Sequence, residues 1–224
     1  MVGPTKDVFM IKVVVIIGSI RPGRNGEAVA RWAHDLATGR DDASFELVDL
    51  KGFNLLHLDE ALPPATGHYA DAHTRAWAAK IASFDAYVFV IPEYNHSTSG
   101  GLKNAIDFLY VEWNDKAAAF VGHSSAGGVR AVEHLRLIMG ELPVADVRTQ
   151  IALSLATDFE NFHVLTPAAL PVPGVSAALV GALVPQRHQG VHPTGYDRTV
   201  RLADRLLRRL QRGPGHLEPG VFPA

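Results

Sequence analysis

Apolar residues recur along this chain in two distinct patterns, and each pattern predicts a different element of secondary structure. Residues 11–17 form a short run that is almost continuously apolar and β-branched, as expected of a strand covered on both faces. Residues 27–38 follow after a loop, and their apolar positions recur at i, i+3, i+4 and i+7. These positions are Val29, Trp32, Ala33 and Leu36. The chain therefore opens with a buried strand followed by an amphipathic helix.

The same alternation of strand and helix continues through most of the chain. Further strands are predicted at 44–49, 86–91, 117–122 and within 146–155, and further helices at 69–83, 101–109 and 128–141. This order predicts an α/β fold in which parallel strands are joined by right-handed crossovers. We therefore expect a doubly wound, five-stranded parallel sheet with helices on both faces.

The pattern weakens after the fifth strand. Residues 157–194 are rich in Pro, Gly, Ala and His, which predicts an irregular surface excursion. Residues 196–212 return to helical spacing, and a flexible tail is expected over 213–224. The sequence thus predicts a single domain over residues 1–212, interrupted by the excursion.

Composition narrows the class of protein. The chain has 224 residues, of which 47% are hydrophobic, which is enough for one folded core. Its 21 Lys and Arg residues nearly balance 23 Asp and Glu residues, so the charge gives no support for a nucleic-acid partner. Cysteine is absent, which excludes disulfides and thiolate metal centres, and the histidine spacing predicts no metal site.

The stretch from Val8 to Ile17 is apolar enough to suggest a secretion signal. Lys12 interrupts it, and the Gly18-Ser19-Ile20-Arg21 sequence follows where a cleavage site would stand. No apolar run reaches the ~20 residues that a bilayer requires. We expect a cytoplasmic protein that does not enter a membrane.

Candidate chemistry lies in the loops that follow the strands, because ligands of open parallel sheets bind at the carboxyl ends of the strands. The first loop, residues 18–26, combines small residues with the donors Ser19, Arg21 and Arg24 and opens onto a helix N-terminus. Such a loop suits a phosphate, but it is neither a Walker loop nor a G-x-G-x-x-G fingerprint. The alternative is an ordinary connection with both arginines in solvent. Asp49 ends the second strand, where a ribose-binding acid would stand.

The loop after the third strand, residues 92–101, carries the next set of candidate groups. Pro92 ends the strand, Tyr94 offers an aromatic surface, and Asn95 offers polar contacts. Two glycines then allow the backbone to come close to a ligand. The loop can line a flat heteroaromatic ring, although its composition fits a simple polar turn equally well.

Four ordered motifs together resemble one family. They are Gly18-Ser19-Ile20-Arg21 with Gly23-Arg24; Pro92-Glu93-Tyr94-Asn95 with Ser97; Leu102-Lys103-Asn104-Ala105-Ile106-Asp107; and Gly127-Gly128-x-Arg130-Ala131 with His134-Leu135-Arg136. The stretch from about residue 10 to 155 resembles the flavodoxin-like NADPH-dependent FMN reductases, which include quinone, azo-dye and chromate reductases. The resemblance implies a flavodoxin-like fold. Residues 157–194 depart from the family pattern.

The resemblance also implies the residues that bind the cofactor. Those implied for the FMN phosphate are Ser19, Arg21, Asn25, Gly26 and Glu27. Those implied for the isoalloxazine are Pro92, Glu93, Tyr94 and Asn95, with Ser124, Ser125, Gly127 and Gly128 closing the ring pocket. No catalytic side chain is implied, because the flavin carries the chemistry.

The implied activity is that of an NAD(P)H-dependent oxidoreductase. Hydride passes from NADPH, or from NADH, to FMN N5, and electrons then pass to a small-molecule acceptor. Quinones, azo compounds, free flavin and metal ions are the implied acceptors. Arg21 or Arg24 can serve the 2′-phosphate of NADPH or serve FMN alone. A homodimer or homotetramer is implied, with Glu93 beside the subunit interface.

Two other functions fit parts of the sequence. A flavodoxin-type electron carrier shares the fold, but such carriers are usually strongly acidic, and this chain is nearly neutral. Gly122-His123-Ser124-Ser125-Ala126 resembles a nucleophile elbow, which allows a serine esterase with Ser124 as nucleophile. Asp158 and one of His163, His188 or His192 would complete that triad.

Overall fold

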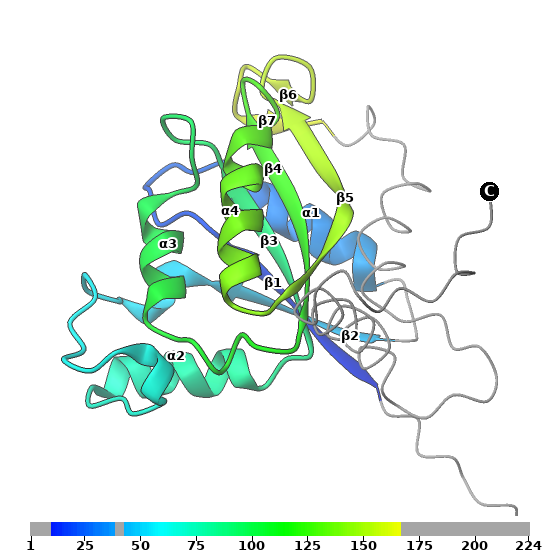
Figure 1. Cartoon of the computed structure of the whole chain (residues 1–224). Helices are drawn as coiled ribbons and strands as arrows, with labels where there is room; N and C mark the ends of the chain where they lie inside the picture. The colour runs from blue at the N-terminus through cyan, green and yellow to red at the C-terminus, as the bar shows by residue number, and fades with distance from the viewer. Residues whose placement is uncertain (1–9, 39–42, 167–224) are drawn as a thin grey trace, which may run out of the picture. The chain divides into compact units, whose positions relative to one another are not determined.

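The computed structural model describes residues 10–38 and 43–166, and within them it shows a five-stranded, all-parallel sheet (Figure 1). The strands follow the order β2-β1-β3-β4-β5. They are β1 (Ile11–Ile17), β2 (Ala43–Asp49), β3 (Ala86–Pro92), β4 (Ala117–Ser124) and β5 (Ala145–Ser154). The predicted flavodoxin-like α/β fold is confirmed.

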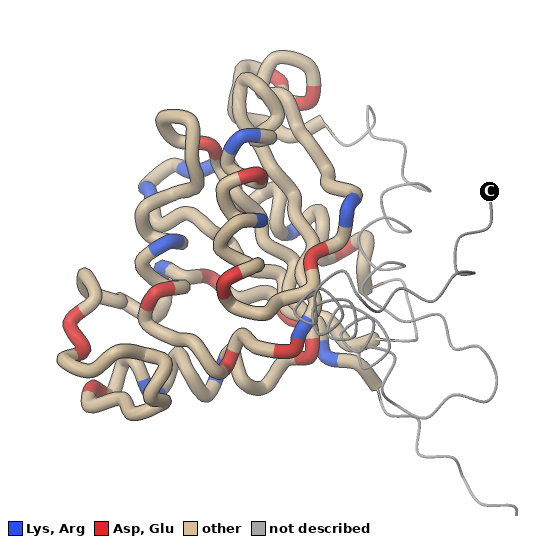
Figure 2. Tube along the Cα trace, in the orientation of Figure 1, with Lys and Arg blue, Asp and Glu red and all other residues tan. Residues whose placement is uncertain are grey.

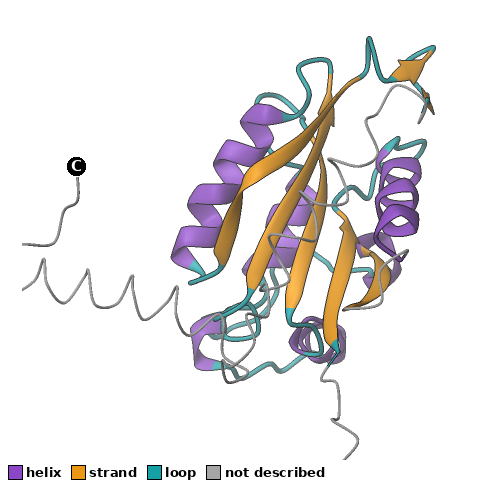
Figure 3. Cartoon of the chain, turned by 90° about the vertical axis from the view of Figure 1, so that its right-hand side faces the viewer, coloured by secondary structure: helices purple, strands orange, loops and turns teal. Residues whose placement is uncertain are grey.

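The helices lie on both faces of this sheet (Figure 3). Helix α1 (Gly26–Thr38) packs on one face, while α2 (Ala72–Ala82), α3 (Gly100–Asp107) and α4 (Val129–Glu141) pack on the other. Two short 3-10 helices, η1 (Leu50–Phe53) and η2 (Pro64–Thr66), lie between β2 and α2. Side chains of β1 alternate between the two cores, as a sheet covered on both faces requires.

The larger core is built around four aromatic rings. Trp77, Tyr87, Phe89 and Trp113 are completely buried, and neighbouring rings meet edge-on or tilted at 5.0–6.1 Å. The two indole groups donate hydrogen bonds to carbonyl oxygens of α3, at 2.8 and 3.2 Å. These bonds connect α3 to α2 and to the segment that follows α3. The loop that precedes α3 is thereby held at the carboxyl edge.

Three predicted segments differ from the structure. The helix predicted from residue 69 begins at Ala72, because the Glu60 carboxylate accepts the backbone N–H groups of Ala70 and Asp71. Strand β4 continues through His123 and Ser124, which were predicted to lie in a loop. Residues 159–165, predicted to be irregular, form a hairpin of β6 (Phe159–Glu160) and β7 (Val164–Leu165).

Several predicted segments fall outside the residues that the structure describes. The helix predicted at 196–212, the tail at 213–224 and the remainder of the excursion lie outside them. Over the described part, acidic and basic positions are interspersed (Figure 2). None of the helices within that part has the length and apolar character needed to cross a bilayer.

Candidate functional site

Three loops meet at the carboxyl ends of β1, β3 and β4. The first two are held together at Gly18, whose N–H donates to Val90 O at 2.9 Å and whose carbonyl accepts the Ser99 hydroxyl. A Cβ on Gly18 would lie 2.7 Å from Val90 O, so no larger residue fits there. Because β1 and β3 are neighbours in a sheet whose order reverses between them, this is where a ligand crevice is expected.

Ser19 and Tyr94 connect the first loop to the loop after β3. The Ser19 Oγ and the Tyr94 hydroxyl share a hydrogen bond of 2.9 Å, and the Ser19 side chain is buried. The exposed Arg21 guanidinium lies over the Tyr94 ring, 5.6 Å from its centroid. The two loops that were predicted to hold the two ends of one ligand therefore lie side by side.

Arg24 has a structural role in the first loop. Its side chain is only 6% exposed and forms an ion pair with Asp49 at the end of β2. It also donates to the backbone oxygen of Ser19 and lies 3.5 Å from a Glu27 carboxylate oxygen. The alternative of a solvent-exposed Arg24 is wrong, and neither Arg24 nor Asp49 is free for phosphate or ribose. Arg21 remains the exposed arginine of this loop.

The N-terminus of α1 presents hydrogen-bond donors that the protein does not use. Asn25 precedes the helix, and its carbonyl accepts the first helical hydrogen bond, from Val29 N–H. Its side chain does not cap the helix but donates to Phe162 O at 2.7 Å. Among the described residues, no acceptor bonds to the first-turn N–H groups of Gly26, Glu27 and Ala28. Unpaired N–H groups at a helix start are suited to an anion.

Glu27 adds a negative charge to this turn, but it is neutralised locally. Its carboxylate lies 2.9 Å from Arg31 and also faces Arg24. The hydrogen bond from Arg31 keeps the pKa of Glu27 below its usual range. The Glu27 carboxylate is thus paired within the protein, while its backbone N–H belongs to the unpaired first turn.

His123 lies beneath the same helical turn. Its side chain is 5% exposed, and Nε2 has no hydrogen-bond partner in the described structure. A Cβ on Gly26 would stand 3.1 Å from this nitrogen, so glycine lets the helix start pass close to the imidazole. Burial lowers the pKa of His123 to about 4, and the ring is neutral at neutral pH. No motif in the sequence assigns His123 to a cofactor site.

The loop after β3 makes a tight turn. Tyr94 and Ser97 exchange two backbone hydrogen bonds, of 2.9 and 3.2 Å, around Asn95 and His96. Both central residues have positive φ, 48° and 72°, which strains non-glycine residues. The turn exposes Asn95, whereas Pro92 is buried as the last residue of β3. Of these two predicted ring contacts, Asn95 is the accessible one in this structure.

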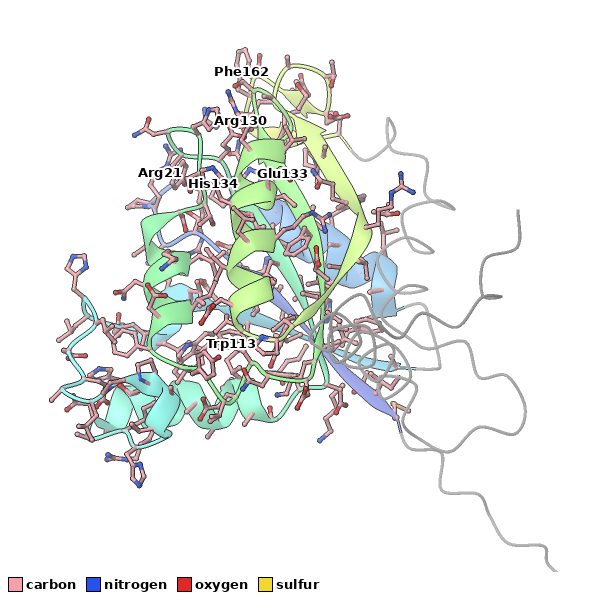
Figure 4. The ribbon with its side chains drawn as sticks, viewed as in Figure 1. Arg21, Trp113, Arg130, Glu133, His134 and Phe162 are labelled. Atoms are coloured by element: carbon pink, nitrogen blue, oxygen red, sulfur yellow. The ribbon has the colours of Figure 1, made fainter. Side chains whose placement is uncertain are left out.

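Glu93 connects the second loop to α4. Its side chain is 3% exposed and forms an ion pair with Arg130, whose backbone N–H also donates to the carboxylate at 3.3 Å. A second link joins His134 Nδ1 to Ser97 Oγ at 2.9 Å. Arg130 and His134 stand with Arg21 at the carboxyl end of the sheet (Figure 4). Both belong to the α4 motif of the sequence, although neither was predicted as a site residue.

The loop after β4 is organised by Ser124. Its buried Oγ accepts the N–H groups of Ala126 and Gly128 at 3.0 and 2.8 Å. Gly127 and Gly128 have positive φ, and a Cβ on either would press on β4 or β5. Their glycine identity is thus required by the turn itself, which leaves Ser125 exposed beside the crevice.

The contacts of Asp158 and His163 argue against the serine esterase alternative. Asp158 accepts the N–H of Ser154 at 2.7 Å, and His163 lies 3.4 Å from the Asn25 side-chain oxygen. Neither residue therefore forms a triad hydrogen bond to Ser124. His188 and His192 lie outside the described residues.

The β6–β7 hairpin lies beside the site, although the sequence pattern did not predict it. Phe162 has a positive φ of 62° and is 61% exposed, and its carbonyl is bound by Asn25. The hairpin stands at the carboxyl end of the sheet, together with the three loops (Figure 4). Strands of two residues are too short to show a hydrophobic period, so sequence patterning gave no signal for them.

Comparison with known proteins decides the family. A family model described as NADPH-dependent FMN reductase matches residues 11–158, which includes all three loops. The chain belongs to the NADPH-dependent FMN reductase family. Membership confirms the predicted oxidoreductase class and its cofactors, FMN and NAD(P)H.

Individual proteins that are similar to this FMN reductase family member are also described as reductases. The chain is 39% identical over 159 residues to an NAD(P)H-dependent FMN reductase of Nectria sp., covering 66% of this chain and 79% of the relative. It is 36% identical over 159 residues to an NAD(P)H-dependent FMN reductase of Schizosaccharomyces pombe, covering 70% and 80%. It is 32% identical over 143 residues to a 2-hydroxy-1,4-benzoquinone reductase of Burkholderia sp., covering 60% and 73%.

The fold has a solved counterpart. The flavoenzyme NAD(P)H:(acceptor) oxidoreductase FerB of Paracoccus denitrificans superposes with a TM-score of 0.60 at 23% identity. The match covers 78% of this chain and 97% of FerB. At this identity the match supports the flavodoxin-like architecture alone.

The residues of this chain fit FMN. The unpaired N–H groups at the start of α1 are suited to its phosphate, and the Asn25 side chain is turned away from them. The exposed Asn95 and Ser125 flank the crevice on the side of β3 and β4, where a flat ring can lie. The donor set therefore suits a ligand with an anionic tail and a polar ring edge.

Proposed function

We propose that this chain is an FMN-dependent NAD(P)H oxidoreductase whose acceptors are quinones and related flat oxidants. When bound, FMN supplies the redox chemistry by taking a hydride from NAD(P)H and passing electrons to the acceptor. The observation that carries the proposal is the row of unpaired N–H groups at the start of α1, beside two loops tied through Ser19 and Tyr94. The quinone reductase among its relatives supports the acceptor class.

The chain's own residues divide into those that hold the phosphate and those that hold the ring. First-turn N–H groups of α1 and the guanidinium of Arg21 bind the phosphate. Tyr94 stands between the two parts, held by Ser19, and supports the shape of the crevice. Asn95 and the exposed Ser125 bind the polar edge of the ring. Pro92, Glu93, Ser124, Gly127 and Gly128 set the shapes of these loops.

The proposed enzyme is an oligomer in which a second copy of the chain packs against the groove between α3 and α4. The groove between α3 and α4 is lined by both apolar and charged side chains, among them Leu137, Ile138 and Lys103, and Leu137 is 77% exposed. One part of this groove, of about 560 Å³, reaches Ser97 and Thr98 in the ring loop. Exposed apolar surface beside a binding loop supports a homodimer, or a homotetramer, with the flavin close to the subunit interface.

We also propose that the enzyme works in the cytoplasm. Its reaction consumes NAD(P)H, and a chain without cysteine needs no oxidising compartment in order to fold. Localisation of a tagged chain by fractionation tests this point, and recovery with periplasmic or secreted proteins would contradict it.

Steady-state turnover separates this proposal from a flavodoxin-type carrier. The FMN-loaded protein is mixed with NADPH or NADH and 1,4-benzoquinone, and nicotinamide oxidation is followed without any added reductase. The proposal predicts sustained turnover over many enzyme equivalents. Turnover that appears only when a separate reductase is added would favour the carrier.

A further inference from the structure

We propose that His123 binds the phosphate group of FMN, as a buried side-chain donor beneath the N-terminus of α1. This inference rests on the proposed FMN site and goes beyond it. It assigns a phosphate contact to β4, whereas the family resemblance implies phosphate contacts in the loop after β1 and at the start of α1.

The first observation is the position of the imidazole. His123 lies on the face of β4 that α1 covers, the same face as Ala119 and Val121. Its Nε2 points at Gly26, the first residue of α1, at the 3.1 Å that separates it from an ideal Cβ. The nitrogen is therefore next to the helical turn whose N–H groups have no acceptor in the described structure.

The second observation is that this buried nitrogen has no partner. A buried polar atom without a hydrogen bond costs about 1–3 kcal/mol relative to a satisfied one. An apolar side chain of similar size would avoid that cost, and the other residues of β4 on this face are apolar. A ligand that supplies an acceptor at the start of α1 would give Nε2 the partner that it lacks.

The third observation concerns the charges around the site. Asp49 and Glu27 both form ion pairs with Arg24 of the first loop, and Glu27 also pairs with Arg31. Asn25, the residue best placed to satisfy the first helical turn, is bound to the hairpin instead. An anion placed here would meet the unpaired N–H groups, the positive end of the helix dipole and the imidazole N–H.

FMN and riboflavin differ only by the phosphate, so they form a direct test. Dissociation constants of both flavins are measured by quenching of flavin fluorescence, for the wild type, His123→Phe and His123→Gln. His73→Phe is the matched control, because His73 lies on α2 and pairs with Asp59 instead of facing α1. Thermal melting of each flavin-free protein checks that the variants are folded.

The proposal predicts that His123→Phe weakens FMN binding about tenfold and leaves riboflavin binding unchanged, since one hydrogen bond to a charged group is lost. His123→Gln keeps a hydrogen-bond donor, so its FMN affinity lies between those of the wild type and His123→Phe. The flavin-free His123→Phe protein melts at or above the wild-type temperature, because the unpaired nitrogen is gone.

Two results would overturn the inference in distinguishable ways. An FMN-to-riboflavin ratio that is the same in wild type, His123→Phe, His123→Gln and His73→Phe would reduce His123 to a packing residue while leaving the FMN site intact. Failure of the wild type to bind either flavin would remove the proposed function, and the inference with it.

Discussion

The hydroxyl of Tyr94 lies 2.9 Å from the Oγ of Ser19 and joins two loops that are 75 residues apart in sequence. The first loop leads into the N-terminus of α1, and the second leads into α3. This hydrogen bond, together with the contacts of Gly18, couples the phosphate end of the proposed site to its ring end. The serine is 1% exposed, so water cannot replace the tyrosine easily.

Tyr94→Phe removes this coupling while keeping the aromatic ring. We expect the free energy of unfolding to fall by about 1 kcal/mol, as for one lost hydrogen bond, and FMN affinity to fall several-fold. Urea unfolding and flavin fluorescence measure the two effects. Tyr110→Phe is the control, since its hydroxyl bonds to Glu141 O at 3.2 Å, away from the loops. Equal effects of the two variants on FMN affinity would contradict the coupling.

The two arginines of the first loop should separate stability from binding. Arg24→Met leaves Asp49 without its cation, and we expect a loss of about 2 kcal/mol in unfolding free energy, because Asp49 is partly exposed. Arg21→Met removes an exposed side chain, so stability changes by less than about 0.5 kcal/mol while FMN affinity falls about tenfold. Urea unfolding and FMN titration are carried out on both variants. A large loss of stability in Arg21→Met, or a loss of FMN affinity without a loss of stability in Arg24→Met, would contradict this division of roles.

The α3–α4 groove makes a prediction about assembly. Leu137→Glu places a charge on its exposed apolar rim, and we expect the oligomer to dissociate into monomers. Met10→Glu is the control, because Met10 is also exposed but precedes β1 and does not line the groove. Light scattering coupled to gel filtration gives the masses. A wild-type monomer, or a Leu137→Glu protein with unchanged mass, would contradict the proposed interface.

His123 predicts a pH dependence of the flavin-free protein. Burial lowers its pKa from 6.5 to about 4, so between these values the unfolded chain binds more protons than the folded chain. This contribution to stability is present above pH 6.5 and is lost as the pH falls towards 4, by up to about 3 kcal/mol.

Urea unfolding of wild type and His123→Phe at several pH values tests this sign. The stability of the variant relative to the wild type should increase as the pH falls from 6.5 to 4. The carboxylates titrate equally in both proteins, so their contributions cancel in the difference between the two free energies of unfolding. A difference that does not change with pH would show that the imidazole is not held neutral by burial.

The sheet was predictable because its strands are buried on both faces. Residues 11–17 and 86–91 are continuous apolar runs, and the structure places β1 and β3 within one residue of those bounds. Helix α1 begins one residue before its predicted start, because its apolar stripe fixes its position. Local patterns were sufficient for these elements.

The site was less predictable because its contacts are distant in sequence. Whether Arg24 binds a ligand or Asp49 depends on the register that places Ile17 beside Asp49, which no local pattern contains. The bond from Asn25 to Phe162 spans 137 residues and depends on the short β6–β7 hairpin. The local pattern predicts His123 in a loop, whereas β4 continues through it and buries its side chain. Motifs thus located the loops, and tertiary packing assigned the side chains.

Anaerobic reduction of the reconstituted protein tests the central claim most directly. The purified chain is saturated with FMN, freed of excess cofactor and mixed with NADPH or NADH in the absence of oxygen. We predict that FMN remains bound at one per chain and that its absorbance at about 450 nm is bleached, then restored by added benzoquinone. A protein that retains no FMN, or one whose bound flavin neither nicotinamide reduces, would contradict the account.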